Sequence, residues 1–249
     1  MKINIFILCY NEEVLIKNTI LHYKQYLPSA NIIILDNKST DNSVNIAKSF
    51  NCNIVEWESP NYKNCIDDFE YKKIKNNCWK YLENGWVLVI DMDEWLCITE
   101  KKLIEEQANG TSIIKVKGID MIGESKTITL EDIELGKINK YNDNRMENKS
   151  LCFLRQNIID MNYDLGAHSC KPLGNVVYSK QIYINKHMCY LGESFIINKM
   201  IKRYERANEM QKHHLATHYT DNISYIKTKY QNSLKNAKQF VNLKQNNKT

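Results

Sequence analysis

Two acidic residues, Asp91 and Asp93, have the spacing of a divalent-metal site. They directly follow the apolar run 86–90 (WVLVI) and flank Met92, with Glu94 next in the chain. Carboxylates at positions i and i+2 beyond a strand offer the hard oxygen ligands that Mg²⁺ and Mn²⁺ prefer, and such a site can join a metal to substrate phosphates. The pair alone is a weak signal, because many strands end in surface aspartates.

Asp36 occupies a similar position, at the end of the apolar run 31–35. It opens the polar segment DNKSTDNS, and its carboxylate can accept a hydrogen bond from a nucleobase N–H or a ribose hydroxyl. The competing interpretation is a turn whose Asp and Ser side chains bond to nearby backbone. We favour the turn for Ser39 and Asp41, because the next helix needs a cap, and a binding role for Asp36.

A third polar segment, YNEE, follows the first apolar run of the chain. Its Tyr10 can stack on a nucleobase. Asn11 can cap the following helix, whose positive end Glu12 and Glu13 would complement. This segment therefore has both a binding and a purely structural interpretation.

Apolar runs alternate with amphipathic stretches over the first 98 residues. The expected strands are Ile3–Cys9, 31–35, 53–57 and 86–90, and the last helix between them is expected at 67–82. This βαβαβαβ order predicts a parallel sheet covered on both faces, which binds ligands at the carboxyl ends of its strands. The second half of the chain predicts strands at 111–117, 151–160 and 176–185, a polar stretch at 123–149, and helices at 193–210 and 224–243.

The composition bounds the class of protein. The 249 residues, 43% apolar and 25% charged, suffice for one large α/β domain or two small ones and exclude bulk disorder. Of the net charge of +5, residues 199–249 carry +8, from nine Lys and two Arg against two Glu and one Asp, which leaves −3 for residues 1–198. Such a basic segment permits an anionic ligand, a membrane surface or nucleic acid as partner, although a solvated helix explains the charge alone.

Eight cysteines occur without a CxxC pair, which argues against a disulfide framework or a thiolate zinc site and favours a reducing, cytoplasmic compartment. No apolar run reaches 18 residues, so no transmembrane segment is expected. The apolar N-terminus lacks a small-residue cleavage site, and we interpret it as a strand rather than a signal peptide.

Taken together, the motifs resemble the glycosyltransferases of the family 2-like group, which have the GT-A fold. The matching stretches are CYNEE, LDNKSTDNS, IKNNCWKYL and VLVIDMDEWL within residues 1–98, with looser matches at FLRQ, GAHS and KHMCYLGESFIINK. The resemblance implies an α/β fold with a mainly parallel central sheet, flanking helices and C-terminal helices. We expect one catalytic domain at 1–192 (nucleotide-binding half 1–98, acceptor half 99–192), a helical extension at 193–249, and no separate further domain.

The resemblance also implies roles for individual residues. Asp93 would ligate the metal, Asp91 would contact the metal or the ribose, and His187 would complete the metal shell, although His187 could also be an ordinary strand-end histidine. The residues implied in nucleotide binding are Tyr10, Asn11, Glu12, Asp36, Lys72, Lys75, Asp91 and Lys199. Lys202 and Arg203 could join Lys199 at the leaving diphosphate, where cations stabilise developing charge, or could form a solvated helix face.

The implied reaction is a metal-dependent transfer, with Mn²⁺ or Mg²⁺, of a sugar from a nucleotide-diphospho-sugar to an acceptor hydroxyl. The family resemblance favours a UDP-sugar donor, an inverting outcome, and a glycan, lipid-linked or protein acceptor. An inverting transfer needs a base, and here the chain departs from the family because it lacks a clear x-Glu-Asp motif. The candidates for the base are Asp164, His168 and Glu193. The chain also lacks QxxRW, so we expect single transfers.

Other functions remain as alternatives. The missing base motif keeps open a catalytically inactive nucleotide-sugar-binding protein on the same fold. A nucleic-acid-binding protein is disfavoured because no signature of one occurs, although the later lysines could touch an anionic membrane. The HHLATH segment lacks the Glu of HExxH, so a zinc protease is not expected, and the position of the DxD argues against a HAD-type phosphatase.

Overall fold

The computed structural model describes residues 1–60, 62–63, 65–125, 135 and 138–239. Its first half is the predicted parallel sheet. β1 (Ile3–Cys9) pairs in parallel with β2 (Asn31–Asp36) on one side and β4 (Trp86–Asp91) on the other, and β3 (Asn53–Glu56) lies outside β2. The four expected strands are confirmed, with ends that differ by no more than one residue.

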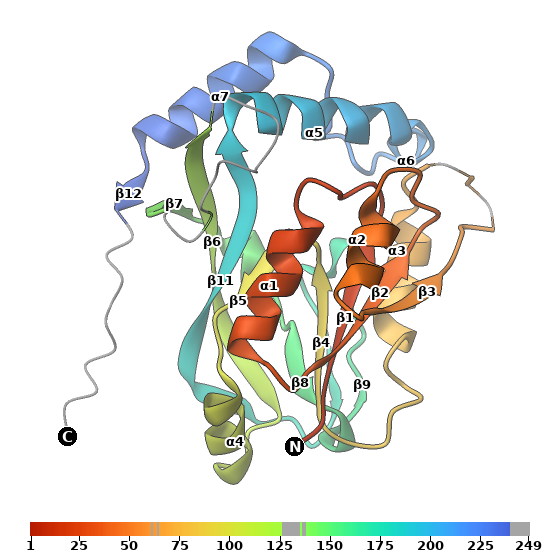
Figure 1. Cartoon of the computed structure of the whole chain (residues 1–249), viewed down its shortest axis with the longest axis vertical. Coiled ribbons are helices and arrows are strands. Elements are labelled where there is room, and N and C mark those ends of the chain that lie inside the picture. The colour runs from red at the N-terminus through yellow and green to blue at the C-terminus, as the bar shows by residue number, and fades with distance from the viewer. Residues whose placement is uncertain (61, 64, 126–134, 136–137, 240–249) are drawn as a thin grey trace.

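β1, β2 and β4 are largely buried because helices cover both faces of this sheet, whereas the edge strand β3 is largely exposed. Alternate residues of β1 point to opposite sides: Ile5 and Ile7 join the core beneath α1 (Ile16–Tyr26), whereas Phe6 and Leu8 pack in a second core that contains Trp79. In Figure 1, α1 and α2 (Ser43–Ser49) lie on one side of the sheet and α3 (Asp68–Asn77) lies behind it. A continuous apolar strand between two cores is what the sequence predicted.

α3 shows how local sequence sets a helix boundary. The carboxylate of Asp67 accepts hydrogen bonds from the backbone N–H groups of Phe69 and Glu70, so Asp67 is the N-cap and the helix begins at Asp68, one residue after the predicted start. The helix ends at Asn77, earlier than the predicted residue 82, and Trp79 then turns inward to the core.

The second half extends the sheet through strands of mixed direction. They are β5 (Glu94–Leu96), β6 (Ile113–Ser125), β7 (Lys140–Asp143), β8 (Cys152–Leu154) and β11 (Tyr178–Gly192), with α4 (Glu100–Ala108) after β5. Over the described residues the sheet order is β12 (Lys238–Gln239), β7, β6, β8, β4, β1, β2 and β3, and β11 pairs with β6 in parallel and with β5 in antiparallel fashion. A separate ribbon joins β9 (Ile158–Asp160) to β10 (Leu173–Gly174).

Two strand predictions need correction. The expected strand 151–160 is two strands, β8 and β9, separated by the 3₁₀ turn Arg155–Asn157. Part of the polar stretch 123–149 forms β7, and residues 126–134 and 136–137 of that stretch lie outside the described residues.

Among the described residues, three helices follow β11, and the first of them lies over one edge of the sheet (Figure 1). α5 (Glu193–Arg206) crosses the carboxyl ends of the parallel strands, at the top of Figure 1, and α7 (Ile223–Lys235) packs against it. The single helix predicted at 193–210 breaks at Ala207 and resumes as α6 (Asn208–Lys212). α7 gives way to β12 (Lys238–Gln239) well before residue 243, and residues 240–243 lie outside the described residues. In the described part of the chain, no helix combines the length and apolar character needed to cross a membrane.

Candidate active site

The parallel pairing brings the three polar segments to one edge of the sheet. Cys9 pairs with Asp36 at the ends of β1 and β2, and Leu8 pairs with Asp91 at the end of β4. Because neighbouring parallel strands end together, Tyr10, Asp36 and Asp91 stand side by side at the carboxyl edge. α5 lies over this edge.

Asp91 is held by two lysines from different parts of the chain. The ammonium of Lys75, on α3, lies 2.8 Å from one carboxylate oxygen, and that of Lys149 lies 3.6 Å from the other. Burial alone would raise the pKa of Asp91, but the two lysines outweigh it and lower the pKa to about 2. The carboxylate is therefore ionised at neutral pH and retains a partly exposed side chain.

Glu94, the third acid of the segment, points into the protein. One carboxylate oxygen lies 2.6 Å from Lys149, and the other accepts a 2.7 Å hydrogen bond from the backbone N–H of Asp91. Burial raises its pKa to about 7, despite the lysine. Glu94 thus shapes the turn that presents Asp91 and Asp93 and does not face the edge of the sheet.

Asp93 is a buried carboxylate surrounded by positive groups. Its Oδ2 lies 3.3 Å from Nε2 of His187 and 4.0 Å from the guanidinium of Arg203, and it accepts a short hydrogen bond from Lys199. Burial opposes ionisation, but Lys199 and His187 hold the pKa of Asp93 well below its usual range. Asp93 and His187, which the resemblance implies as metal ligands, therefore lie next to each other although 94 residues separate them in the sequence.

His187 reaches Asp93 because β11 runs beside both β5 and β6. It pairs with Glu94 of β5 and with Asp120 of β6. Its Nδ1 donates a 2.7 Å hydrogen bond to Asp120, so Nε2 is directed at Asp93. Burial opposes its charge, but the neighbouring acidic groups Cys189, Asp93 and Asp120 raise the pKa of His187 well above its usual value.

α5 and its C-terminal end place three cations over the acidic edge. Lys199 contacts Asp93, Arg203 lies between Asp93 and Glu12 (3.9 Å), and the guanidinium carbon of Arg206 stands 3.2 Å from the centre of the Tyr10 ring. Lys202, which the resemblance grouped with Lys199 and Arg203, is exposed and makes none of the contacts to Asp93 that Lys199 and Arg203 make.

Asn11 has a different role from the predicted helix cap. It adopts a positive φ of 52°, and its side-chain oxygen accepts hydrogen bonds from the backbone N–H groups of Thr40 (2.7 Å) and Asp41 (3.3 Å). α1 begins only at Ile16, and no acidic residue lies in its first turn. Asn11 therefore ties the loop after β1 to the loop after β2, and this tie sets the shape of both.

Glu12 and Asp41 complete the link between these loops. The N–H of Glu12 donates to Ser43 (2.8 Å), and one oxygen of Asp41 accepts from the N–H of Glu13 (3.0 Å) while the other accepts from the N–H of Ser43 (2.9 Å). The structural interpretation of Asp41 is confirmed. The carboxylate of Glu12 faces Arg203 and Lys199, and burial raises its pKa.

Asp36 is buried, and only one of its two carboxylate oxygens has a hydrogen-bond partner among the described residues. Its Oδ2 accepts a 3.1 Å hydrogen bond from the N–H of Ser39, whereas its Oδ1 has no partner among the described residues. Buried carboxylate oxygens without partners are rare, and one at a ligand-binding edge is a candidate acceptor for a ligand N–H. Lys72 lies one turn before Lys75 on α3 and is half-buried, without the contact to Asp91 that Lys75 makes.

The three candidate bases lie in two places. Asp164 and His168 are exposed on the turn around Leu165–Ala167, which the side chain of Asn76 ties to α3 through the backbone of Tyr163. Glu193, at the start of α5, lies 3.4 Å from Lys227 of α7. Its carboxylate is therefore engaged with α7, and the structure does not bring it into contact with Asp91 or Asp93.

His168 has an ordered ring. Its Nδ1–H donates a 2.9 Å hydrogen bond to the carbonyl of Met146, which leaves Nε2 as the acceptor of the neutral ring. Gly166 has a φ of 72°, and a Cβ there would lie 2.8 Å from the imidazole, so only glycine fits beneath it. Asp164 accepts a 2.6 Å hydrogen bond from the hydroxyl of Ser169.

The HHLATH segment is not a helix over its length. His214 and Ala216 have positive φ values, and His213 lies 3.3 Å from the hydroxyl of Tyr62. This arrangement separates the histidines that a helix would have aligned, in keeping with the absence of a zinc-protease motif.

Sequence reasoning missed Lys149, Glu147 and Asp120. Lys149 is 5% exposed and lies within 3.6 Å of Asp91, Glu94 and Glu147. Each missed residue lies outside the recognised motifs: Asp120 is on β6, Glu147 ends the 3₁₀ turn Arg145–Glu147, and Lys149 is in the loop that follows this turn. The sequence offers no local signal for them.

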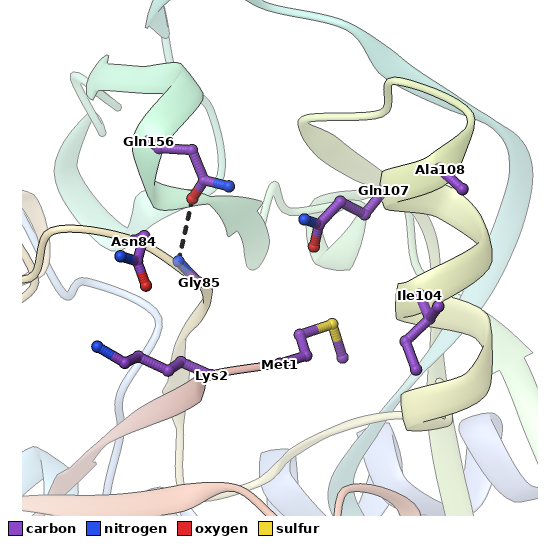
Figure 2. Close-up of a pocket in the computed structure, with 8 residues that line it drawn as sticks. All are labelled: Met1, Lys2, Asn84, Gly85, Ile104, Gln107, Ala108 and Gln156. Atoms are coloured by element: carbon purple, nitrogen blue, oxygen red, sulfur yellow. Dashed lines mark hydrogen bonds between the residues drawn. The ribbon is translucent and has the colours of Figure 1, made fainter.

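One hollow of the surface lies away from this edge of the sheet. It measures about 550 Å³ and is lined by Lys2, Asn84 and Gly85 together with Ile104 and Gln107 of α4. Figure 2 shows it at the amino ends of β1 and β4, where Gln156 accepts a hydrogen bond from the N–H of Gly85. It is remote from Asp36 and Asp93 and offers no acidic or imidazole group, so it is not the candidate active site.

In this α/β fold, the DxD pair Asp91 and Asp93, His187 and the cations of α5 lie at the carboxyl edge of the sheet. This combination is typical of the GT-A class of nucleotide-diphospho-sugar transferases. Comparison with known families gives the same answer. The model of glycosyl transferase family 2 matches residues 4–155, well over half of the chain, and the chain belongs to this family.

Several solved structures of glycosyltransferases are similar to this chain. TarS of S. aureus is 14% identical over 94% of this chain and 43% of its own, with a TM-score of 0.47. TarS residues 1–349 with UDP-GlcNAc is 14% identical over 94% of this chain and 72% of its own, with a TM-score of 0.43. Glucosyl-3-phosphoglycerate synthase from Mycobacterium tuberculosis with Mn²⁺ and UDP-glucose is 18% identical over 47% of this chain and 43% of its own, with a TM-score of 0.33. This chain thus spans less than half of the full TarS structure, and comparison with curated proteins gives no match.

Proposed function

We propose that the protein is a metal-dependent glycosyltransferase that moves a sugar from a nucleotide-diphospho-sugar to an acceptor hydroxyl with inversion. The observation that carries the proposal is the convergence of Asp93 Oδ2 and His187 Nε2, 3.3 Å apart, beneath the cations of α5. Family membership supports the reaction class.

The donor set fits a divalent metal. Asp93 supplies a carboxylate oxygen and His187 an imidazole nitrogen, a combination suited to Mn²⁺ and compatible with Mg²⁺. Asp91 is already paired with Lys75 and Lys149, so we assign it to the ribose or to an outer position on the metal. Such a metal neutralises the charge of the donor diphosphate.

The nucleotide half of the site would be formed by Tyr10 and Asp36. The Tyr10 ring offers a stacking face, and the unpaired oxygen of Asp36 suits a base that presents a ring N–H, as uracil does. We therefore propose a UDP-sugar donor. Asn11 and Glu12 would hold the loop shape, and Lys72 and Lys75 would lie on the α3 side.

Departure of the diphosphate needs positive charge near its oxygens. Lys199 and Arg203 lie beside Asp93 and would stabilise the leaving group as the glycosidic bond breaks. For the acceptor, we propose that His168 Nε2 or Asp164 removes the hydroxyl proton, with Glu193 a weaker choice because Lys227 engages it. The acceptor would be a glycan, a lipid-linked sugar or a protein, and the eight free cysteines support a cytoplasmic location.

The test is transfer and donor hydrolysis with a panel of UDP- and GDP-sugars, with and without Mn²⁺. Asp93→Asn should abolish the metal-dependent rate. Asp143→Asn, which changes an exposed aspartate paired with Lys117 and Lys238, is the matched control and should leave the rate unchanged. Full activity of Asp93→Asn would refute the metal role. Nucleotide-sugar binding without turnover or hydrolysis, over a broad acceptor panel, would favour the inactive binding protein.

A further inference from the structure

Asp120 stands directly behind His187. The parallel pairing of β6 with β11 places the two residues opposite each other, and Oδ1 of Asp120 accepts a 2.7 Å hydrogen bond from Nδ1 of His187. The other ring nitrogen, Nε2, faces Asp93 at 3.3 Å. The imidazole therefore lies between two carboxylates, one from β6 and one from the turn between β4 and β5.

Asp120 is itself fixed from the opposite side. The side-chain amide of Asn144 donates to both of its oxygens, at 3.0 and 3.1 Å, and the thiol of Cys189 lies 3.5 Å from Oδ1. A carboxylate held in this way has its orientation set before any ligand arrives. Among ligating histidines, a carboxylate on the second ring nitrogen fixes the ring and its tautomer and strengthens the ligand.

We propose that Asp120 is a positioning residue that keeps the Nδ1 proton of His187 engaged, so that Nε2, beside Asp93, is the nitrogen that gives up its proton and offers its lone pair when a metal binds. This inference rests on the proposed function, because it assumes that Asp93 and His187 share a metal. Asp120 acts through His187 and does not touch substrate. Asn144 is the group that keeps Asp120 in place.

A different arrangement uses the same residues. Asp120, His187 and Cys189 place one ligand atom each within 4.8 Å of one another and could hold a metal themselves. In that arrangement Nδ1 would be metal-bound and could not donate to Asp120. The two arrangements thus differ in which ring nitrogen carries the proton, and this difference can be measured.

The first experiment measures Mn²⁺ affinity from the electron paramagnetic resonance signal of the free ion. Asp120→Asn should weaken Mn²⁺ binding by about 10- to 100-fold, while metal-free UDP binding and the thermal unfolding midpoint stay close to wild type. Asp143→Asn, the same change on the neighbouring strand β7, should leave Mn²⁺ affinity unchanged. Wild-type Mn²⁺ affinity in Asp120→Asn would overturn the inference alone, whereas a wild-type protein that binds no Mn²⁺ would overturn the proposed metal dependence as well.

The second experiment needs no substitution at Asp120. Long-range ¹H–¹⁵N spectra of the histidine rings in the wild-type protein with Zn²⁺, a diamagnetic probe, should show His187 protonated at Nδ1 and bare at Nε2. Protonation at Nε2 would overturn the inference and support the Asp120–His187–Cys189 arrangement. A sulfur-to-cobalt charge-transfer band with Co²⁺ that disappears in Cys189→Ala would do the same.

Discussion

The ammonium group of Lys199, on α5, donates a hydrogen bond to the buried carboxylate of Asp93, the central acid of the candidate metal site. The contact joins residues 106 positions apart and brings α5 down onto the edge of the sheet. A cation therefore already compensates the charge of Asp93 in this state of the protein. A divalent ion at Asp93 would compete with Lys199 or share the carboxylate with it.

This competition gives opposite effects on binding and on turnover. Lys199→Met should strengthen nucleotide-free Mn²⁺ binding by about tenfold, equivalent to ~1.4 kcal/mol, because the ammonium no longer neutralises Asp93. The same change should lower the transfer rate by about 10²-fold or more, because a donor to the leaving diphosphate is lost. Mn²⁺ titration and kcat measurements test both, with Lys202→Met, an exposed neighbour on α5, as the control. Weaker Mn²⁺ binding in Lys199→Met would contradict the competition.

The Tyr10 ring and Arg206 predict a second pair of opposite effects. Tyr10→Ala should weaken UDP binding by about 5- to 100-fold, the usual range for loss of one stacked base. Arg206→Ala should strengthen it by a few fold, because a base that stacks on this face must displace the guanidinium, a contact of about 1 kcal/mol. Calorimetric titration with UDP checks both variants. Tighter binding by Tyr10→Ala would exclude the stacking role, and Tyr10→Phe should bind as wild type does.

Lys149 should be a strong determinant of stability. It is buried with Glu94, Glu147 and Asp91 within 3.6 Å, so Lys149→Met leaves a cluster of carboxylates without their central cation. We expect a loss of about 3–5 kcal/mol in the free energy of unfolding, measured with urea. Because Glu94→Gln removes one of the stranded charges, the double variant should lose less than the sum of the two single variants. Strict additivity would mean that the network does not act as a unit.

The burial of His22 should make the free energy of unfolding depend on pH. It is buried against Trp95 with a ring separation of 4.9 Å, and its Nε2 bonds to the carbonyl of Leu96. Burial lowers its pKa from 6.5 to about 4. The unfolded chain therefore binds a proton between these values while the folded protein does not. The contribution of neutral His22 to the free energy of unfolding is complete above pH 6.5 and is lost as the pH falls toward 4.

The size of this effect follows from the pKa shift. It amounts to about 3 kcal/mol by pH 4, since each pKa unit corresponds to ~1.4 kcal/mol. Urea unfolding of wild type and of His22→Gln, compared from pH 7.5 to 4.5, should show a steeper decline for wild type. Parallel curves would remove His22 as the cause and leave the carboxylates to explain acid sensitivity.

Much of the fold of residues 1–98 was predictable because its signals are local. Apolar runs with both faces buried mark parallel strands, and Asp67 marks the start of α3 through its own hydrogen bonds to the helix. The prediction that Asn11 caps a helix was wrong, because α1 begins only at Ile16 and its first turn is out of reach of Asn11. The loop after β2 offers Asn11 two backbone N–H groups, and no pattern near residue 11 reveals them.

The sequence by itself determined that Tyr10, Asp36, Asp91 and Asp93 would meet, because parallel strands that follow one another through helices must end at the same edge. Only the tertiary structure decided what surrounds them. Asp120 meets His187 because β6 and β11 pair in one particular register, and Lys199 meets Asp93 because α5 crosses above β4. Such contacts depend on which strands are neighbours and how a distant helix packs, and free energies of packing over the whole chain set both. No spacing within a single segment encodes them.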